Sequence, residues 1–173
     1  MLFRSVTDMS NVFDGCSHIV SLDPLSNWQT GKVTDMYRMF EDCSNLTGLV
    51  GLADWDTGNV TNMMEVFSGC RQLTDLTPLT NWQTGKVTDM SYMFYNCSKL
   101  TDLTPLINWQ TGKVTDMSYM FANCAKLTNT VGINSWDISK VTTFAGMFGN
   151  CPSHPEFTKR SGTWDSGTFK PTI

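Results

Sequence analysis

The cysteines are the residues whose type and spacing most directly suggest chemistry. They recur at intervals of 27 residues, at Cys16, Cys43, Cys70, Cys97, Cys124 and Cys151. An even number of cysteines is typical of a disulfide framework, and paired cysteines can hold zinc. The spacing argues against both: equivalent side chains of stacked repeats point the same way, and packed helices would hold their cysteines about 8–10 Å apart, beyond the reach of a disulfide. We therefore predict six buried free thiols that pack as small apolar side chains.

Two polar columns share this register. Residues that can cap a helix stand at Asp8, Asp35, Asn62, Asp89, Asp116 and Thr143. One such residue per repeat suits a helix N-cap, whereas a calcium site needs several oxygen ligands around each ion. Lysines stand at Lys32, Lys86, Lys113 and Lys140. We predict helix capping for the first column and a solvated face for the second, with a track for an anion or an acidic glycan as the alternative for the lysines.

The chain carries no recognisable catalytic motif. It contains no G-x-S-x-G, H-E-x-x-H or Gly-rich phosphate loop, and neither His18 nor His154 adjoins a nucleophile at a recurring position. We therefore expect a protein that is not an enzyme and that needs no cofactor and no metal.

The composition excludes further classes. With 12 Lys and Arg against 16 Asp and Glu, a net charge of −4 gives no basic surface for nucleic acid. An aromatic content of 12% is too high for a disordered tail. No run approaches the ~18 apolar residues of a membrane span, and the first four residues lack the pattern of a signal peptide. We expect a folded chain that inserts into no membrane.

These columns belong to one unbroken repeat. The string Val-Thr-Asp-Met, strict or with one change, begins at Val6, Val33, Val60, Val87, Val114 and Val141. Because so small a unit cannot bury its apolar face alone, neighbouring units must stack into a solenoid with one continuous core. In the fourth unit, apolar residues from Met90 to Cys97 have the spacing of one helix face, which predicts a helix of two to three turns after Asp89. The leucines from Leu100 to Leu106 predict a short extended segment.

Written as a pattern, the unit reads W-[DQ]-T-G-[KN]-V-T-[DN]-M-x-x-M-F-x-x-C-x-x-L over about residues 1–151. This pattern resembles the repeat of the BspA-like leucine-rich-repeat surface proteins. The resemblance implies an α/β, leucine-rich-repeat-like solenoid that is extracellular or at a cell surface and that binds protein or glycan partners there. We expect five full coils from Val6, a half coil that ends at Cys151, and a C-terminal capping segment over residues 152–173.

Large apolar columns supply the expected core. Tryptophans stand at Trp28, Trp55, Trp82, Trp109 and Trp136. We predict a buried ladder in which each indole N–H meets a nearby carbonyl, with an exposed stacking platform for sugars as the alternative. Methionines at Met9, Met36, Met63, Met90 and Met117, and at Met39, Met93, Met120 and Met147, are also predicted to be core.

Residues that vary between units are the candidates for binding. On the solvent side of the predicted helix, one column reads Asn11, Arg38, Glu65, Tyr92, Tyr119 and Gly146. The position three residues later reads Asp14, Glu41, Ser68, Tyr95, Ala122 and Gly149. We expect Tyr92, Tyr95 and Tyr119 to cluster as a binding patch, with Arg38 and Glu65 beside them. The alternative is that the rings lie flat along the helix row and are structural.

We therefore expect a non-catalytic adhesion module that binds through one face of the solenoid. The alternative is a structural spacer or an assembly subunit of a larger surface or virion-like particle. The first complete coil should expose Val12 and Phe13, with only Leu2 and Phe3 to cover them. We expect this end to be either a cut from a longer array or a docking face, through which the isolated chain would self-associate as a two-fold homodimer.

Overall fold

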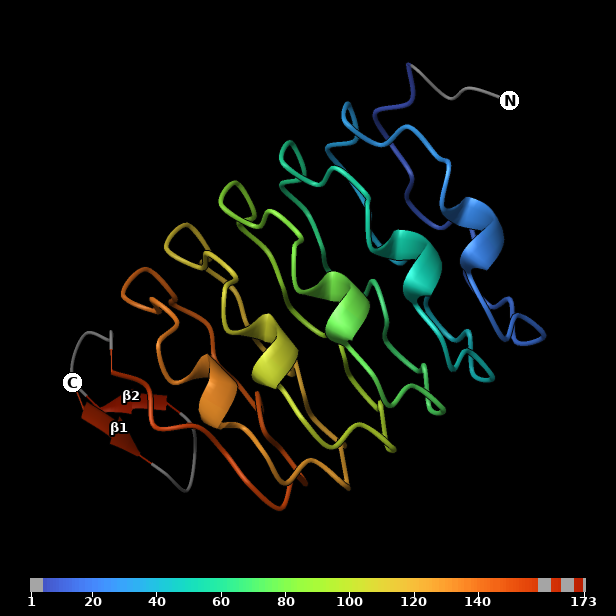
Figure 1. The fold of residues 1–173 in the computed structure, drawn as a ribbon. Coiled ribbons are helices and arrows are strands. Elements are labelled where there is room, and N and C mark those ends of the chain that lie inside the picture. The colour runs from blue at the N-terminus through green and yellow to red at the C-terminus, as the bar shows by residue number, and fades with distance from the viewer. Residues whose placement is uncertain (1–4, 159–162, 166–169, 173) are drawn as a thin grey trace.

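The repeats form coils that stack side by side in chain order. The computed structural model describes residues 5–158, 163–165 and 170–172. Each coil lies directly beside the next along the stack (Figure 1). Parallel bridges join the same position of successive coils, in the pairs Asp8–Asp35, Asp35–Asn62, Asn62–Asp89, Asp89–Asp116 and Asp116–Thr143. We refer to the stretches that begin at the six repeat valines as the first to the sixth coil.

Each of the first five coils contains one short 3-10 helix. These helices are η1 (Asp23–Leu25), η2 (Val50–Leu52), η3 (Thr77–Leu79), η4 (Thr104–Leu106) and η5 (Val131–Ile133), and they form one row along the stack (Figure 1). A proline at the start of η1, η3 and η4 presets the helical φ angle. The expectation of an extended segment was therefore wrong for the residues of η4.

The predicted helix from Met90 to Cys97 is also wrong. This segment is a series of turns, and the described residues contain no α-helix. Tyr92 and Asn96 have φ angles of 56° and 59°, in the left-handed region that a right-handed helix cannot include. The N–H group of Met90 donates to the carbonyl of Asp116 in the next coil, at 3.0 Å. The α part of the predicted α/β class therefore has no counterpart in these residues.

Every coil turns through two left-handed residues, four positions apart. The first position holds Asn11, Arg38, Glu65, Tyr92, Tyr119 and Gly146. The second position holds Gly15, Asp42, Gly69, Asn96, Asn123 and Asn150. Apolar residues before, between and after these two turns have the same spacing as one face of a helix, which explains the incorrect prediction.

The column of aspartates caps a turn rather than a helix. The Oδ1 atom of Asp89 accepts hydrogen bonds from the backbone N–H and the hydroxyl of Ser91, at 2.8 and 2.6 Å. The same contact joins Asp116 to Ser118. This is the local side-chain geometry of an Asx turn. It fixes the direction in which the chain enters the first left-handed residue.

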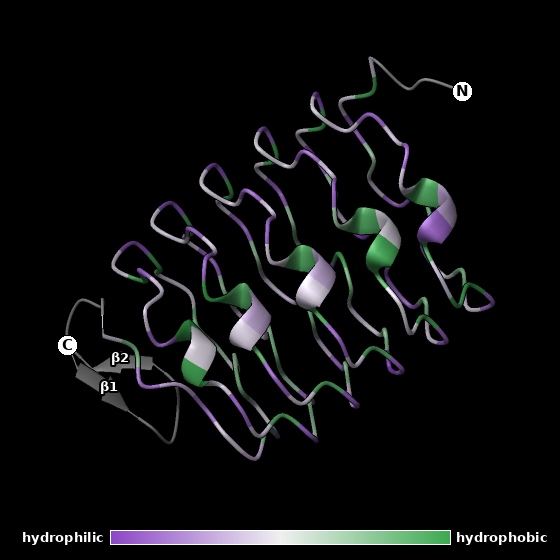
Figure 2. Ribbon diagram, viewed as in Figure 1, coloured by the Kyte–Doolittle hydropathy of each residue, from purple (hydrophilic) through white to green (hydrophobic). Residues whose placement is uncertain are grey.

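Aromatic side chains form continuous ladders through the core. The ring of Phe94 stacks on those of Phe67 and Phe121, with centroids 5.6 and 5.5 Å apart. The indole N–H of Trp82 donates to the carbonyl of Leu52 at 3.0 Å, as its equivalents do in other coils. The predicted core role of the tryptophans is confirmed from the second to the fifth coil, and the methionine columns are buried throughout. Hydropathy accordingly repeats from coil to coil (Figure 2).

The cysteine side chains form a column of the same kind, with one thiol in each coil. The Sγ–H of Cys97 donates to the carbonyl of Phe67 at 3.3 Å, and all six cysteines are unbridged. The four central thiols are buried as predicted, but Cys16 and Cys151 are only half-buried. Burial raises the pKa of Cys43 to about 12. The expected separation of 8–10 Å does not apply, because neighbouring coils are hydrogen-bonded like adjacent strands, at about 4.8 Å.

The chain after the sixth coil packs against the end of the stack. Phe157 is buried in the core, and the N–H group of Thr158 donates to the carbonyl of Asn134 at 3.0 Å. Further on, β1 (Thr163–Asp165) pairs antiparallel with β2 (Lys170–Thr172).

Candidate binding stripe

The first left-handed position places a row of long side chains on the outside of the stack. We call this row the outer stripe: Arg38, Glu65, Tyr92 and Tyr119. Each member occupies the same place in successive coils, so its side chain lies next to that of the neighbouring coil. The sequence prediction placed these residues on one solvent-exposed face. The structure brings them together, although by a turn rather than by a helix, and it does not expose them all, because Glu65 is only 7% exposed.

The backbone at these positions does not favour the residues found there. Left-handed φ angles cost a residue with a Cβ atom roughly 1–2 kcal/mol, and only glycine, asparagine and aspartate tolerate them readily. The first and sixth coils use the tolerant residues Asn11 and Gly146, whereas the outer stripe uses arginine, glutamate and tyrosine. Strained positions of this kind are concentrated at functional sites.

The tyrosines form a compact aromatic cluster. The rings of Tyr92 and Tyr119 are stacked, with centroids 4.9 Å apart and planes inclined by 18°. Tyr95 meets Tyr92 edge-on at 5.5 Å. Tyr119 is 38% exposed, whereas Tyr92 and Tyr95 are half-buried. Burial of the ring raises the pKa of Tyr92 above its ordinary value.

A glycine makes room for the last ring of this cluster. A Cβ atom at Gly146 would lie 2.6 Å from Cε1 of Tyr119, so the tyrosine ring lies directly over the backbone of the sixth coil. The neighbouring positions hold the small residues Ala122 and Gly149. The cluster is therefore bordered on this side by a low surface rather than by another long side chain.

The other end of the outer stripe is charged. Nε of Arg38 lies 2.6 Å from Oε2 of Glu65 and 3.1 Å from Oε2 of Glu41. Burial, followed by the negative charge of Glu65, raises the pKa of Glu41 to about 7. One guanidinium group thus pairs with two carboxylates. Because the pKa of Glu41 lies near neutral pH, its protonation changes the net charge of this end of the outer stripe.

Tyr37 belongs to the same surface, and the sequence prediction missed it. Cζ of Arg38 lies 5.0 Å from the centroid of the Tyr37 ring, within the range of a cation–π contact. Its position holds serine in the first, fourth and fifth coils, at Ser10, Ser91 and Ser118. A large aromatic residue in that column was the signal that could have found it.

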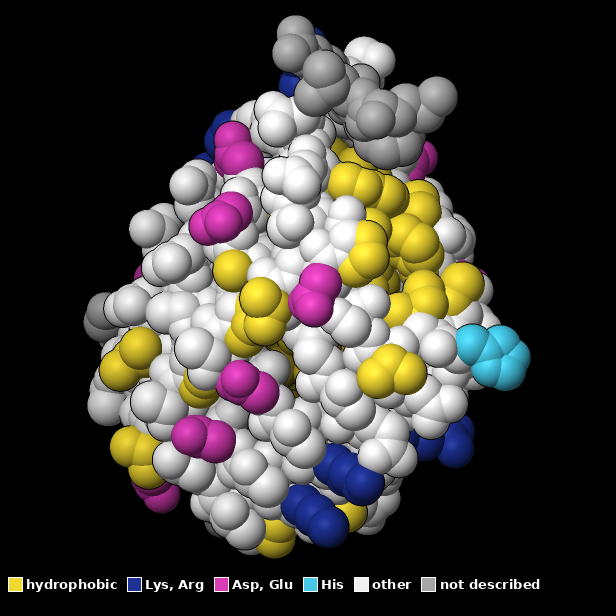
Figure 3. Space-filling view, turned by 45° about the vertical axis from the view of Figure 1, so that its right-hand side comes forward, with side chains coloured by type: hydrophobic (Ala, Val, Ile, Leu, Met, Phe, Trp, Pro, Cys, Tyr) yellow, Lys and Arg dark blue, Asp and Glu magenta, His cyan; other side chains and the backbone are white. Residues whose placement is uncertain are grey.

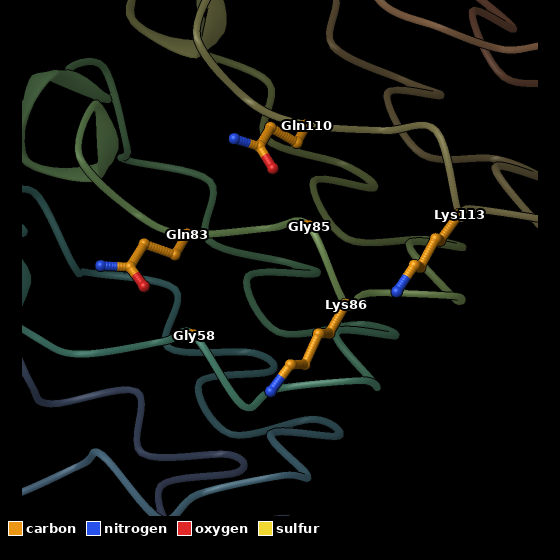
Figure 4. Close-up of a pocket in the computed structure, with 6 residues that line it drawn as sticks. All are labelled: Gly58, Gln83, Gly85, Lys86, Gln110 and Lys113. Atoms are coloured by element: carbon orange, nitrogen blue, oxygen red, sulfur yellow. The ribbon is translucent and has the colours of Figure 1, made fainter.

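The lysine row borders a shallow polar hollow on another part of the coils. The hollow has a volume of about 450 Å³ and is lined by Gly58, Gln83, Gly85, Lys86, Gln110 and Lys113. The two glutamines and the two lysines lie parallel, one coil apart (Figure 4). The ammonium group of Lys86 donates to Oδ1 of Asn59 at 2.7 Å, so only part of its hydrogen-bonding capacity remains for a ligand. The hollow is a second, more polar candidate surface.

The residues predicted for self-association lie at the first coil. Val12 is 47% exposed, and Phe13 is half-buried and stacks on Phe40 with centroids 5.4 Å apart. Leu2 and Phe3 lie outside the described residues.

Neither a metal site nor a membrane helix is present in the described part of the chain. No group of three or more His, Cys, Asp or Glu side chains there is arranged to hold a metal ion. No helix among the described residues is long and apolar enough to cross a membrane. The outer stripe and the polar hollow carry aromatic rings, hydroxyls, amides and an ion pair, which are groups typical of protein contact surfaces.

These features define a repeat protein. The same residue types recur at the interior positions of successive coils, whereas the residues of the outer stripe differ from coil to coil. The chain belongs to the family described as Mycoplasma protein of unknown function, DUF285, whose model matches residues 7–104 and 76–170. Membership bears out the coarser part of the predicted resemblance, a repeat-containing protein of the surface type. Comparison with curated proteins and with solved structures gives no match.

Proposed function

We propose that this chain is a non-catalytic binding module of the BspA-like leucine-rich-repeat type, acting at a cell surface and holding a protein partner on the outer stripe. The observation that carries the proposal is the use of arginine, glutamate and tyrosine at left-handed positions. The backbone alone would favour glycine or asparagine there, so the side chains are retained for what they contact.

The chemistry of the stripe favours a protein over a glycan as the partner. Tyrosine presents a large rigid contact area at low entropic cost, and arginine and tyrosine dominate the energetics of protein interfaces. Tyr92 and Tyr119 stack on each other instead of standing apart as a platform for sugar rings. The charged end around Arg38 adds a polar border that fixes the register of a partner.

The test uses two matched double variants and two sets of immobilised probes. Tyr92→Asn with Tyr119→Asn removes the rings while keeping a residue that tolerates the left-handed backbone. Lys86→Ser with Lys113→Ser alters the polar hollow instead. Surface plasmon resonance is measured on a panel of extracellular-matrix proteins and on a glycan array.

We expect saturable binding to a protein probe that weakens at least tenfold in the tyrosine variant and persists in the lysine variant. The opposite pattern, with glycan binding lost in the lysine variant, would move the function to the polar hollow. If the unchanged protein binds no probe saturably, the structural spacer or assembly subunit becomes the better account.

A further inference from the structure

The side of the first coil that faces away from the second is incompletely covered. We call it the N-terminal face: Val6, Val12, Phe13, Cys16, Ile19 and Trp28. One coil further on, the equivalent residues are at most 4% exposed: Val33, Met39, Phe40, Cys43, Leu46 and Trp55. Figure 3, which brings the N-terminal side of the stack forward, shows hydrophobic side chains gathered there. This face thus has the composition of an interior.

The backbone of the same face has a definite hydrogen-bonding polarity. Between the first two coils, N–H groups of one coil donate to carbonyls of the next in four rows, at 2.8–2.9 Å: Met9 to Asp35, Asn11 to Tyr37, Phe13 to Met39 and Gly15 to Glu41. The rows recur at later interfaces. In the first coil, the matching acceptors are the carbonyls of Asp8, Ser10, Val12 and Asp14, and no described residue donates to them. A row of acceptors therefore lies along an apolar face.

This polarity decides which partner fits. In the two-fold homodimer predicted from the sequence, one row of carbonyls would face another, and the two rows could not satisfy each other. A partner must instead bring N–H donors at every second residue together with apolar side chains. The repeat itself has such an edge on its C-terminal side, as each coil of the stack demonstrates.

A second copy of the chain does not offer that edge in an open form. Its donor positions lie in the sixth coil, whose apolar side chains are already covered: Val141, Phe144, Met147 and Phe148 are at most 6% exposed, and Phe157 of the following segment is buried in the same cluster. We propose that the N-terminal face is a docking surface for a further coil of the same repeat, which binds with its donor edge first and continues the stack head to tail.

The test adds such a coil in register. In one variant, a copy of residues 87–113 replaces residues 1–5, so that its last lysine directly precedes Val6, as Lys113 precedes Val114. The cysteine of the copy is changed to alanine. Alkylation of Cys16 is then followed by peptide mapping, because Cys16 lies on the N-terminal face and is half-buried. The matched control carries a scrambled extension of the same composition.

We expect the added coil to slow the alkylation of Cys16 at least tenfold and to raise Tm by several degrees, while the scrambled extension changes neither. Equal reactivity of Cys16 in both variants would overturn the proposal.

Sedimentation of the unchanged protein provides a second, independent measurement. We expect a monomer in which Cys16 reacts. A dimer that protects Cys16 and that Val12→Glu dissociates would show that the face pairs with itself, and would also overturn the proposal.

Discussion

Each coil passes through two left-handed residues, and the two positions are filled differently. The second position holds only glycine, asparagine and aspartate, the residues that such a backbone accepts at little cost. The outer stripe, at the first position, holds arginine, glutamate and tyrosine in four consecutive coils. The same local strain is thus avoided at one position and accepted at the other. The residues at the second position are those that the left-handed backbone tolerates, whereas the residues of the outer stripe are chosen for the contacts that their side chains make.

The largest effect is expected from disturbing the second position. Gly69 has a φ angle of +74°, and a Cβ atom there would collide with Oδ1 of Asp42. Gly69→Val combines left-handed strain with overpacking and should lower the free energy of unfolding by about 2–5 kcal/mol in urea denaturation. Gly48→Ala is the control, since a Cβ atom there meets nothing within 4 Å. A mild effect at Gly69 would contradict the backbone role of the second position.

The charged end of the outer stripe should make stability depend on pH. The pKa of Glu41 is raised to about 7 in the folded chain, so its protonated form stabilises the fold at pH 5. That contribution is lost as the pH rises through 7, and amounts to on the order of 2 kcal/mol. Glu41→Gln should therefore flatten the dependence of unfolding free energy on pH between 5 and 8. The exposed Glu156→Gln should leave it unchanged, and an equally steep dependence in Glu41→Gln would disprove the assignment.

A smaller loss is expected when the turn that leads into the stripe loses its cap. Asp89→Ala removes two hydrogen bonds to Ser91 and should lower the unfolding free energy by about 0.5–2 kcal/mol. Addition of a chelator should not change the melting temperature of either protein. A substantial drop in the unchanged protein would instead support calcium at the aspartate column.

The smallest effect on stability is expected at the aromatic end. Tyr119→Asn loses the stacking on Tyr92, worth about 0.5–1.5 kcal/mol, and relieves left-handed strain of similar size. The two contributions offset, so the unfolding free energy should change by less than about 1 kcal/mol while binding weakens. A collapse of stability, measured by thermal denaturation, would make the tyrosines structural and would remove the contrast between the two positions.

The buried columns could be predicted from the sequence because an exact period places identical side chains on top of each other. The burial of Trp82 and the acceptor for its N–H followed directly from that argument. The helix from Met90 to Cys97 was wrongly predicted, because apolar spacing does not distinguish a helix from a coil with two left-handed turns. The signal that separates them was present in the second position, where every coil carries a glycine, asparagine or aspartate, such as Gly69 and Asn96.

The candidate site was partly predictable for a related reason. Comparison of repeats finds the positions that vary, and so it found Tyr92 and its neighbours. It could not find how they touch, because the ion pair between Arg38 and Glu65 and the contact of Tyr37 with Arg38 depend on the spacing between coils. That spacing follows from strand-like hydrogen bonding, which the expectation of helices had excluded.

The peptide groups in the four rows that join neighbouring coils all point the same way along the stack. Their carbonyls face the N-terminal side, as in the bond from Arg38 to Met64. Other carbonyls face the opposite way, such as that of Thr34, which accepts from Thr61, and that of Leu52, which accepts from the indole of Trp82. Each peptide carries a dipole of about 3.5 D, and aligned dipoles add. Within these four rows the peptide dipoles therefore add across the chain direction, with their negative ends towards the first coil. The contribution of these rows favours positive charge beside the first coil and negative charge at the opposite end of the stack.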